Sequence, residues 1–160
     1  MTELTVTRTI NAPPERIWRA LTNADELAAW FWPGKWDVTA TCDLRVGGTY
    51  RVASEVTGMA FGGEYVAVEP FVRLVQTWRW DGEPGETLVT TTLEPSAEGT
   101  MLTIVHERFA THDEATQHQQ GWNDCLDRLP GHLGIHREAR AAWFAKVAEE
   151  RVRRADSRRD

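Results

Sequence analysis

The hydrophobic period changes within one stretch, residues 100–129, which reads TMLTIVHERFATHDEATQHQQGWNDCLDRL. The first ten residues follow a period of two, which would place Leu102, Ile104 and His106 on one face of a strand. Thr111 and Glu114 then form a capping box, and apolar residues recur at helical spacing to about residue 128. The stretch therefore predicts a last strand followed by a long helix.

The period of two extends upstream from this stretch to about Trp36, with glycine- and proline-containing turns between the apolar runs. Turns this short join antiparallel strands, because parallel strands need long crossovers. Leu4–Ile10 also alternates and is rich in β-branched residues, which predicts a first strand. The predicted strands cover residues 4–10, 36–42, 48–55, 58–68, 72–80, 87–94 and 100–109.

Two short helices are predicted between the first and second strands. Pro13 and Pro14 suit the first turn of a helix, where a missing N–H costs nothing. Asn23 and Glu26 resemble a capping box for a second helix that ends before Pro33. The long helix is predicted over roughly 112–128, with Pro130-Gly131 ending or kinking it.

A half-polar sheet must cover its apolar face, and the long helix is the only large element left to do so. This order of elements predicts an α+β fold in which a curved antiparallel sheet of about seven strands grips the C-terminal helix. A curved sheet cannot contact a straight helix along its whole length. We therefore expect an internal cavity, and small-molecule sites are usually concave and largely apolar.

Composition sets the broad class of the protein. A chain of 160 residues with eight tryptophans is long enough for a single packed domain, and the net charge of −6 argues against nucleic-acid binding. No apolar run approaches the ~20 residues of a membrane span, and the N-terminus lacks a signal-peptide pattern. We expect a cytoplasmic protein without membrane insertion, and Cys42 and Cys125 as reduced thiols.

Residues 134–160 form a separate compositional unit, a C-terminal helical extension with a basic end, beyond the domain at 1–133. The extension carries a net charge of +3, against −9 for the rest of the chain. Its amphipathic segment, about 136–152, presents Trp143, which needs a surface to bury it. That surface is either the protein's own domain or a second copy, which would make a homodimer.

Several segments resemble, in the right order, the START-like or SRPBCC superfamily, and most closely the branch named for the C-terminal domain of the activator of heat-shock-protein-90 ATPase. These segments are 11–22, 29–33, 46–50, 63–70, 73–78 and Gly121-Trp122 with Leu126 and Leu129. The resemblance covers about residues 3–133 and implies the helix-grip fold, also called Bet v allergen-like. It also implies binding of a small hydrophobic or aromatic ligand, since members include lipid and hormone carriers and polyketide cyclases.

The cavity candidates are aromatic and polar side chains expected on inward faces. Trp78 and Trp80 share a strand face with Leu74 and Gln76, Trp122 faces them from the helix, and Cys125 follows one turn later. Any of these tryptophans could equally be plain core packing. The full set of candidates is Trp30, Trp32, Trp78, Trp80, His106, His118, Trp122 and Cys125.

Other chemistries find little support, so no catalytic residue, metal or cofactor is assigned. His132 and His136 have metal-ligand spacing, but Gly134 lies between them and no third ligand is evident. There is no Gly-x-Ser-x-Gly motif and no glycine-rich phosphate cradle. Arg51, Arg79 and Arg108 are expected on the solvated face, where an inward-turned one would instead anchor a carboxylate.

Two other functions stay open. By resemblance alone, the chain could be a stress-linked protein-interaction module that contacts the chaperone. Alternatively, it could be an enzyme of the polyketide cyclase or aromatase type that uses His106 or His118 in proton transfer. The function predicted first is noncatalytic or weakly catalytic ligand binding.

Overall fold

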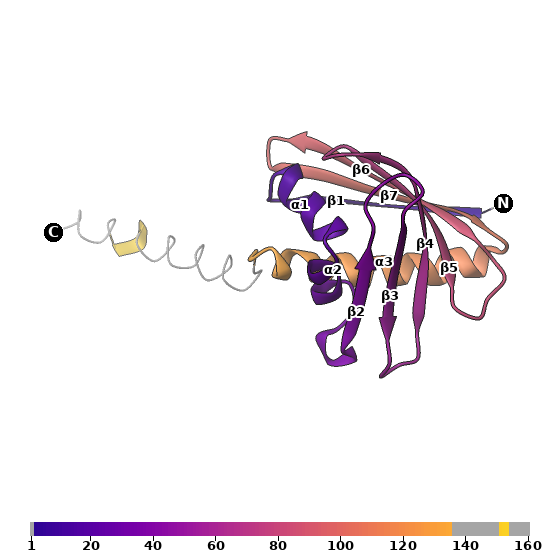
Figure 1. Cartoon of the computed structure of the whole chain (residues 1–160). Helices are drawn as coiled ribbons and strands as arrows, with labels where there is room; N and C mark the ends of the chain where they lie inside the picture. The colour runs from indigo at the N-terminus through magenta and orange to yellow at the C-terminus, as the bar shows by residue number, and fades with distance from the viewer. Residues whose placement is uncertain (1, 136–150, 154–160) are drawn as a thin grey trace.

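The computed structural model describes residues 2–135 and 151–153, in which a curved antiparallel sheet wraps around a long helix (Figure 1). The sheet has seven strands in the order β1-β7-β6-β5-β4-β3-β2. The strands are β1 Thr2–Ile10, β2 Val38–Cys42, β3 Thr49–Ser54, β4 Ala60–Glu69, β5 Arg73–Trp80, β6 Thr87–Ser96 and β7 Gly99–Phe109. The predicted α+β helix-grip architecture is confirmed.

Two short helices follow β1, as predicted: α1 spans Pro14–Thr22 and α2 spans Ala24–Trp30. The Asn23 side chain caps α2 by accepting a hydrogen bond from the Glu26 N–H at 3.1 Å. The strand predicted from Trp36 begins two residues later, because Gly34–Trp36 forms a 3₁₀ turn that the period of two does not reveal. The turn ends at Asp37, whose φ of 53° breaks the strand pattern.

The long helix α3, His112–His132, begins at the predicted cap but does not end before Pro130. Gly134 ends it instead, with a φ of 82° that favours glycine. The Ile135 N–H donates to the Pro130 carbonyl at 2.8 Å, and the Gly134 N–H donates to the Gly131 carbonyl at 3.1 Å. These two bonds form a Schellman motif, which closes the helix one turn later than expected.

Near its end, β7 contains a bulge that controls which side chains face inward. Thr2 pairs with Phe109 and Leu4 with His106, so two residues of β7 lie opposite one residue of β1. Arg108 takes up the irregularity with a φ of 73°. As a result, His106 and Phe109 are both buried, although regular alternation would turn residue 109 outward.

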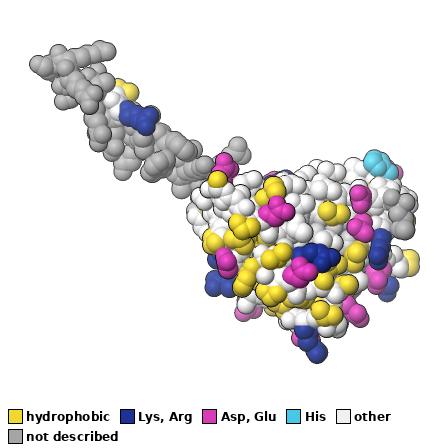
Figure 2. All heavy atoms as spheres, turned by 90° about the horizontal axis from the view of Figure 1, so that it is seen from above, with side chains coloured by type: hydrophobic (Ala, Val, Ile, Leu, Met, Phe, Trp, Pro, Cys, Tyr) yellow, Lys and Arg dark blue, Asp and Glu magenta, His cyan; other side chains and the backbone are white. Residues whose placement is uncertain are grey.

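The outer surface is mixed in character. Arg51, Arg79 and Arg108 are exposed, and Arg51 makes a two-pronged ion pair with Asp81 at 2.6 and 2.7 Å. On the face shown in Figure 2, hydrophobic side chains occur in groups separated by charged ones. None of these three arginines is therefore an anchor inside the fold.

Candidate functional site

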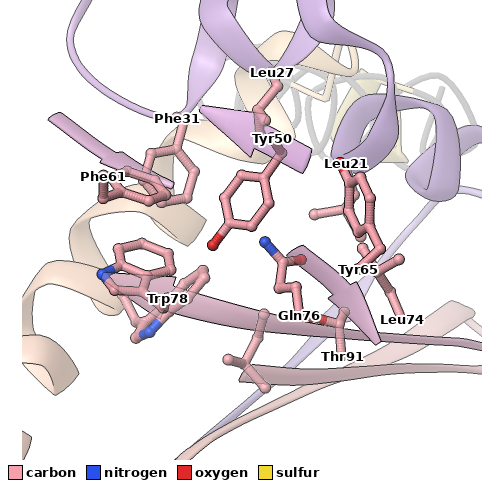
Figure 3. Close-up of a pocket in the computed structure, with 12 residues that line it drawn as sticks. Leu21, Leu27, Phe31, Tyr50, Phe61, Tyr65, Leu74, Gln76, Trp78 and Thr91 are labelled. Atoms are coloured by element: carbon pink, nitrogen blue, oxygen red, sulfur yellow. The ribbon is translucent and has the colours of Figure 1, made fainter. Parts of the chain in front are cut away.

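A small cavity of about 30 Å³ lies between the inner face of the sheet and the helices (Figure 3). Every layer of the fold contributes to its wall. The lining residues are Leu21, Leu27, Phe31, Tyr50, Phe61, Tyr65, Leu74, Gln76, Trp78, Thr91, Ile104 and Trp122. The volume is enough for one or two water molecules, so side chains fill most of the interior.

The polar part of the wall is uncharged. The Tyr50 hydroxyl donates to the Thr77 carbonyl at 2.6 Å, and the Gln76 amide points toward that hydroxyl across the cavity (Figure 3). Burial raises the pKa of Tyr50, so its side chain stays a neutral phenol. The cavity thus combines an apolar wall with a few neutral hydrogen-bonding groups.

Stacked aromatic rings form one side of the cavity. The Phe61 ring lies on the Trp78 indole with a centroid distance of 3.6 Å and an angle of 10°. The Phe31 ring packs at 5.3 Å from Phe61 and 5.7 Å from Trp122. Within the described residues, the buried indole N–H of Trp78 has no hydrogen-bond acceptor. An unpaired buried donor costs about 1–3 kcal/mol.

His106 lies next to this aromatic wall and is fully buried. Its Nδ1 accepts a hydrogen bond from the Trp122 indole at 3.0 Å, so the ring proton is on Nε2. Nε2 lies 2.7 Å from the Thr87 hydroxyl, which in turn donates to the Trp78 carbonyl. Burial lowers the pKa of His106 to about 3, and the nearby His118 adds to this effect.

His118 forms a second histidine–tryptophan pair, nearer the surface. Its Nε2 accepts from the Trp80 indole at 2.8 Å, and its Nδ1 lies 2.8 Å from the Glu114 carbonyl, to which the Nδ1–H donates. The two imidazoles are 5.2 Å apart, and the Phe109 ring contacts both. Both imidazoles are therefore held in place by hydrogen bonds at both ring nitrogens.

An arginine from α3 holds the backbone at Phe31. The Arg128 guanidinium donates to the carbonyls of Phe31, at 2.7 Å, and Trp30, at 3.2 Å. These carbonyls lie at the C-terminal end of α2, where a cation is favourable. Arg128 thus ties α2 and the segment after it to the long helix.

The eight residues predicted for the site do not all lie together in the structure. Trp78 and Trp122 line the cavity, while Trp80, His106 and His118 lie in the adjoining histidine–tryptophan pairs. Trp32 stacks on Trp80 at 6.2 Å, but the Trp30 indole donates to the Ala20 carbonyl, on the side of α1. The Cys125 thiol is buried beside Arg128, and burial raises its pKa to about 12.

Other cavity residues were absent from the predicted set. The sequence pattern does not show which side chains of the neighbouring segments point toward β5. This applies to Tyr50, Phe61 and Phe31. Gln76 was identifiable, because it alternates with Leu74 and Trp78 on one strand face.

Metal-ligand geometry is lacking in residues 2–135 and 151–153, where no three His, Cys, Asp or Glu side chains gather. The His132 Nε2 instead lies 2.9 Å from the Glu26 carboxylate. His136 falls outside the described residues, as do most of the predicted extension and Trp143.

The curved sheet, the gripped helix and the cavity between them define a helix-grip domain of the START-like class. The chain belongs to the family described as Activator of Hsp90 ATPase homolog 1-like protein, whose model matches residues 11–134. This confirms the resemblance carried by the sequence motifs. No protein with a curated description matches the chain.

Solved structures share the fold over most of the chain. CV1439 from Chromobacterium violaceum is 32% identical with a TM-score of 0.69, covering 81% of this chain and 95% of its own. DynU16, a protein in the dynemicin biosynthetic locus, is 29% identical with a TM-score of 0.73, covering 82% and 47%. PFC0360w, an HSP90 activator from Plasmodium falciparum, is 22% identical with a TM-score of 0.68, covering 84% and 97%, which shows the fold alone.

None of the described helices has both the length and the apolar character needed to cross a bilayer.

Proposed function

We propose that the protein binds a small hydrophobic or aromatic ligand between the sheet and the helices, without chemical conversion. The observation that supports this most is the aromatic cavity, whose wall contains Gln76, Tyr50 and Thr91 but no charged side chain. Ligand pockets commonly have this character, a mostly apolar wall with a few polar groups.

The small volume of the cavity implies that ligand binding requires movement of side chains. Ligand pockets usually have volumes of roughly 300–1,000 Å³, far above the 30 Å³ found here. A ligand must therefore displace side chains. The Phe31 side chain is well placed to move, because Phe31 follows α2 rather than lying within the sheet.

Binding is favoured over catalysis by the hydrogen bonds of the two histidines. His106 and His118 each accept a hydrogen bond from an indole N–H, and each donates its remaining proton within the fold. A general base needs a free nitrogen within reach of its substrate. Neither ring has one in this conformation.

The test is a screen of lipids, flavonoids, polyketides and small aromatic compounds by thermal shift and native mass spectrometry. Thr91→Leu would fill the cavity and should abolish binding of any hit, because Thr91 is buried in the cavity wall. Thr92→Leu is the matched control, one residue along β6 and on the opposite strand face, and should leave binding unchanged. A screen with no binder, or equal effects of the two variants, would refute the proposal.

A second candidate, a protein-interaction module, is favoured by the β4–β5 turn. Phe71 occupies this turn with a φ of 69°, where glycine is preferred, and its side chain is 45% exposed. Backbone strain of this kind costs about 1–3 kcal/mol and often marks functional sites. The solved structure of an HSP90 activator with the same fold makes that chaperone the partner to test.

Phe71→Gly separates a partner contact from a structural role. The variant relieves the backbone strain but loses the edge contact between the Phe71 and Trp18 rings, whose centroids are 6.2 Å apart, so its stability should change little. Capture of the chaperone and stimulation of its ATPase should fall. Failure of the unmodified protein to capture the chaperone or change its ATPase rate would end this candidate.

A further inference from the structure

Five of the chain's eight tryptophans form a continuous row through the fold. Neighbouring indoles have ring-centroid distances of 5.7 Å for Trp36 and Trp32, 6.2 Å for Trp32 and Trp80, 5.7 Å for Trp80 and Trp78, and 5.6 Å for Trp78 and Trp122. The rings of Trp32 and Trp80 are stacked, with an angle of 12° between their planes. The row therefore links the 3₁₀ turn, β5 and α3 through rings in contact.

The row also joins the surface to the wall of the cavity. Trp36 and Trp80 are partly exposed, whereas Trp78 and Trp122 line the cavity. An indole is among the side chains that lose one electron most readily, and an electron passes between rings in contact without movement of either ring. Oxidation of one tryptophan in the row is therefore transferable to another.

The final position of the missing electron depends on the indole proton. Loss of one electron makes an indole N–H strongly acidic, so a ring with a base within hydrogen-bond distance is stabilised as a neutral radical. Within the described residues, two members of the row have such a base. Trp80 donates to His118 Nε2 at 2.8 Å, and Trp122 donates to His106 Nδ1 at 3.0 Å.

His118 is the better proton acceptor of the two histidines. A proton on His106 would place a charge in a fully buried site, and burial, with the neighbouring His118, lowers the pKa of His106 to about 3. His118 is partly exposed, and its Nδ1–H donates to the Glu114 carbonyl at 2.8 Å. That hydrogen bond is kept when Nε2 takes a proton. Trp80 is therefore the member of the row that best accommodates the loss of both an electron and a proton.

We propose that the row carries oxidising equivalents to Trp80, which holds them as a neutral indole radical with its proton on His118 Nε2. A one-electron oxidant takes an electron from one tryptophan of the row, and an electron from Trp80 replaces it. The Trp80 N–H bond breaks, and a new N–H bond forms at His118. A reductant such as ascorbate or a thiolate then returns one electron to the partly exposed Trp80, and His118 returns the proton. This activity goes beyond the proposed ligand binding and keeps the cavity wall reduced.

Flash photolysis of the full chain tests the row. A ruthenium polypyridyl label is attached at Lys35→Cys, an exposed position next to Trp36, and a flash with an electron-accepting quencher turns the label into a one-electron oxidant. Cys42→Ser directs the label to this position, because Cys125 is buried. Trp143→Phe removes an indole that lies outside the described residues. We expect the absorption spectrum of a neutral tryptophan radical.

Two substitutions in this background locate the radical and its path. Trp80→Phe should lose the radical because its site is gone, and Trp32→Phe should lose it because the row is interrupted. Leucine at the same two positions is the second choice if a phenylalanine variant does not fold. Trp30→Phe is the matched control and should keep the radical, because Trp30 is buried outside the row with its indole bonded to the Ala20 carbonyl.

His118→Gln tests the proton acceptor, because glutamine accepts a hydrogen bond but is not a base. This variant should show the spectrum of the protonated indole radical, with a shorter lifetime. The proposal is overturned if the labelled protein forms no tryptophan radical, if Trp32→Phe leaves the radical unchanged, or if His118→Gln still gives the neutral form.

Discussion

His106 has a proton on Nε2 and a hydrogen bond from Trp122 at Nδ1, so a second proton would break that bond. Its pKa of about 3 in the folded protein lies below the ordinary value of 6.5. Between these values the unfolded chain binds more protons than the folded one. Stability is therefore greatest above pH 6.5 and falls as the pH decreases toward 3, by up to about 1.4 kcal/mol per pH unit.

His106→Gln should remove this pH dependence, because glutamine can donate to Thr87 but does not titrate. Urea unfolding between about pH 5 and pH 7.5 measures the slope in both proteins. The exposed His112, changed to Gln, is the control and should keep the slope of the unmodified protein. Equal slopes for unmodified protein and His106→Gln would contradict this assignment.

At the scale of single residues, the sequence predicts which face of a strand a side chain lies on better than it predicts the hydrogen-bond partner of that side chain. The inward placement of His106 follows from its alternation with Leu102 and Ile104, and it is confirmed. Its pairing with Trp122, 16 residues away, depends on how the helix lies across the sheet. The bulge at Arg108 has no sequence signal either, since arginine is not typical of a positive φ.

At the scale of elements, α2 depends on Arg128 to satisfy the carbonyls of Trp30 and Phe31. Arg128→Met should destabilise the fold by about 1–3 kcal/mol, because two hydrogen bonds from a charged group are lost. It should also speed hydrogen exchange of the α2 amides more than that of the strands, since the helix loses its link to α3.

The matched control for Arg128→Met is Arg8→Met, which also breaks an arginine hydrogen bond to α3, at Asn123, but lies on β1. That variant should leave exchange in α2 unchanged. If both variants accelerate α2 equally, the effect reflects general destabilisation rather than the cap.

Element boundaries follow the local signals that set them. The starts of α2 and α3 were predictable because Asn23 and Thr111 accept hydrogen bonds within their own segments. The end of α3 was not, because the proline signal at Pro130 outweighed the glycine signal four residues later. A proline near the end of a helix removes one N–H donor, whereas Gly134 supplies the conformation that closes the helix.

At the scale of the whole molecule, one carboxylate joins helices α1, α2 and α3. Glu26 on α2 accepts hydrogen bonds from Arg16 and Arg19 on α1, each at 2.6 Å, and lies 2.9 Å from His132 on α3. Burial favours a higher pKa, but the hydrogen bonds from His132, Arg16 and Arg19 outweigh it and lower the pKa of Glu26 to about 2.

The carboxylate should therefore stabilise the fold above pH 4.5, with the effect lost as the pH falls toward 2. Glu26→Gln should lower stability at about pH 6 and show a weaker loss between pH 4.5 and 2, measured by chemical unfolding. The exposed Glu64, changed to Gln, should behave like the unmodified protein. Parallel acid profiles for Glu26→Gln and the unmodified protein would refute the role of this junction.

The architecture was predictable at this scale, but the size of the cavity was not. Alternation, turns and caps define the curved sheet and its helix, and these patterns act locally. The volume left inside depends on how rings from every layer fit together, such as those of Phe31 and Phe61, which pack 5.3 Å apart in the cavity wall. A family resemblance does not carry that information, because relatives with the same backbone can fill it differently.

The β7 bulge also has a consequence for insertions and deletions. Removing one residue between His106 and Phe109 would restore regular pairing with β1 and would keep both side chains on the inner face, because the two residues would then be two positions apart. A single-codon deletion here would thus leave the start of α3 on the same side of the sheet, whereas a deletion in a regular part of β7 would turn it to the other side. The bulge absorbs one residue without changing the direction of the chain that follows.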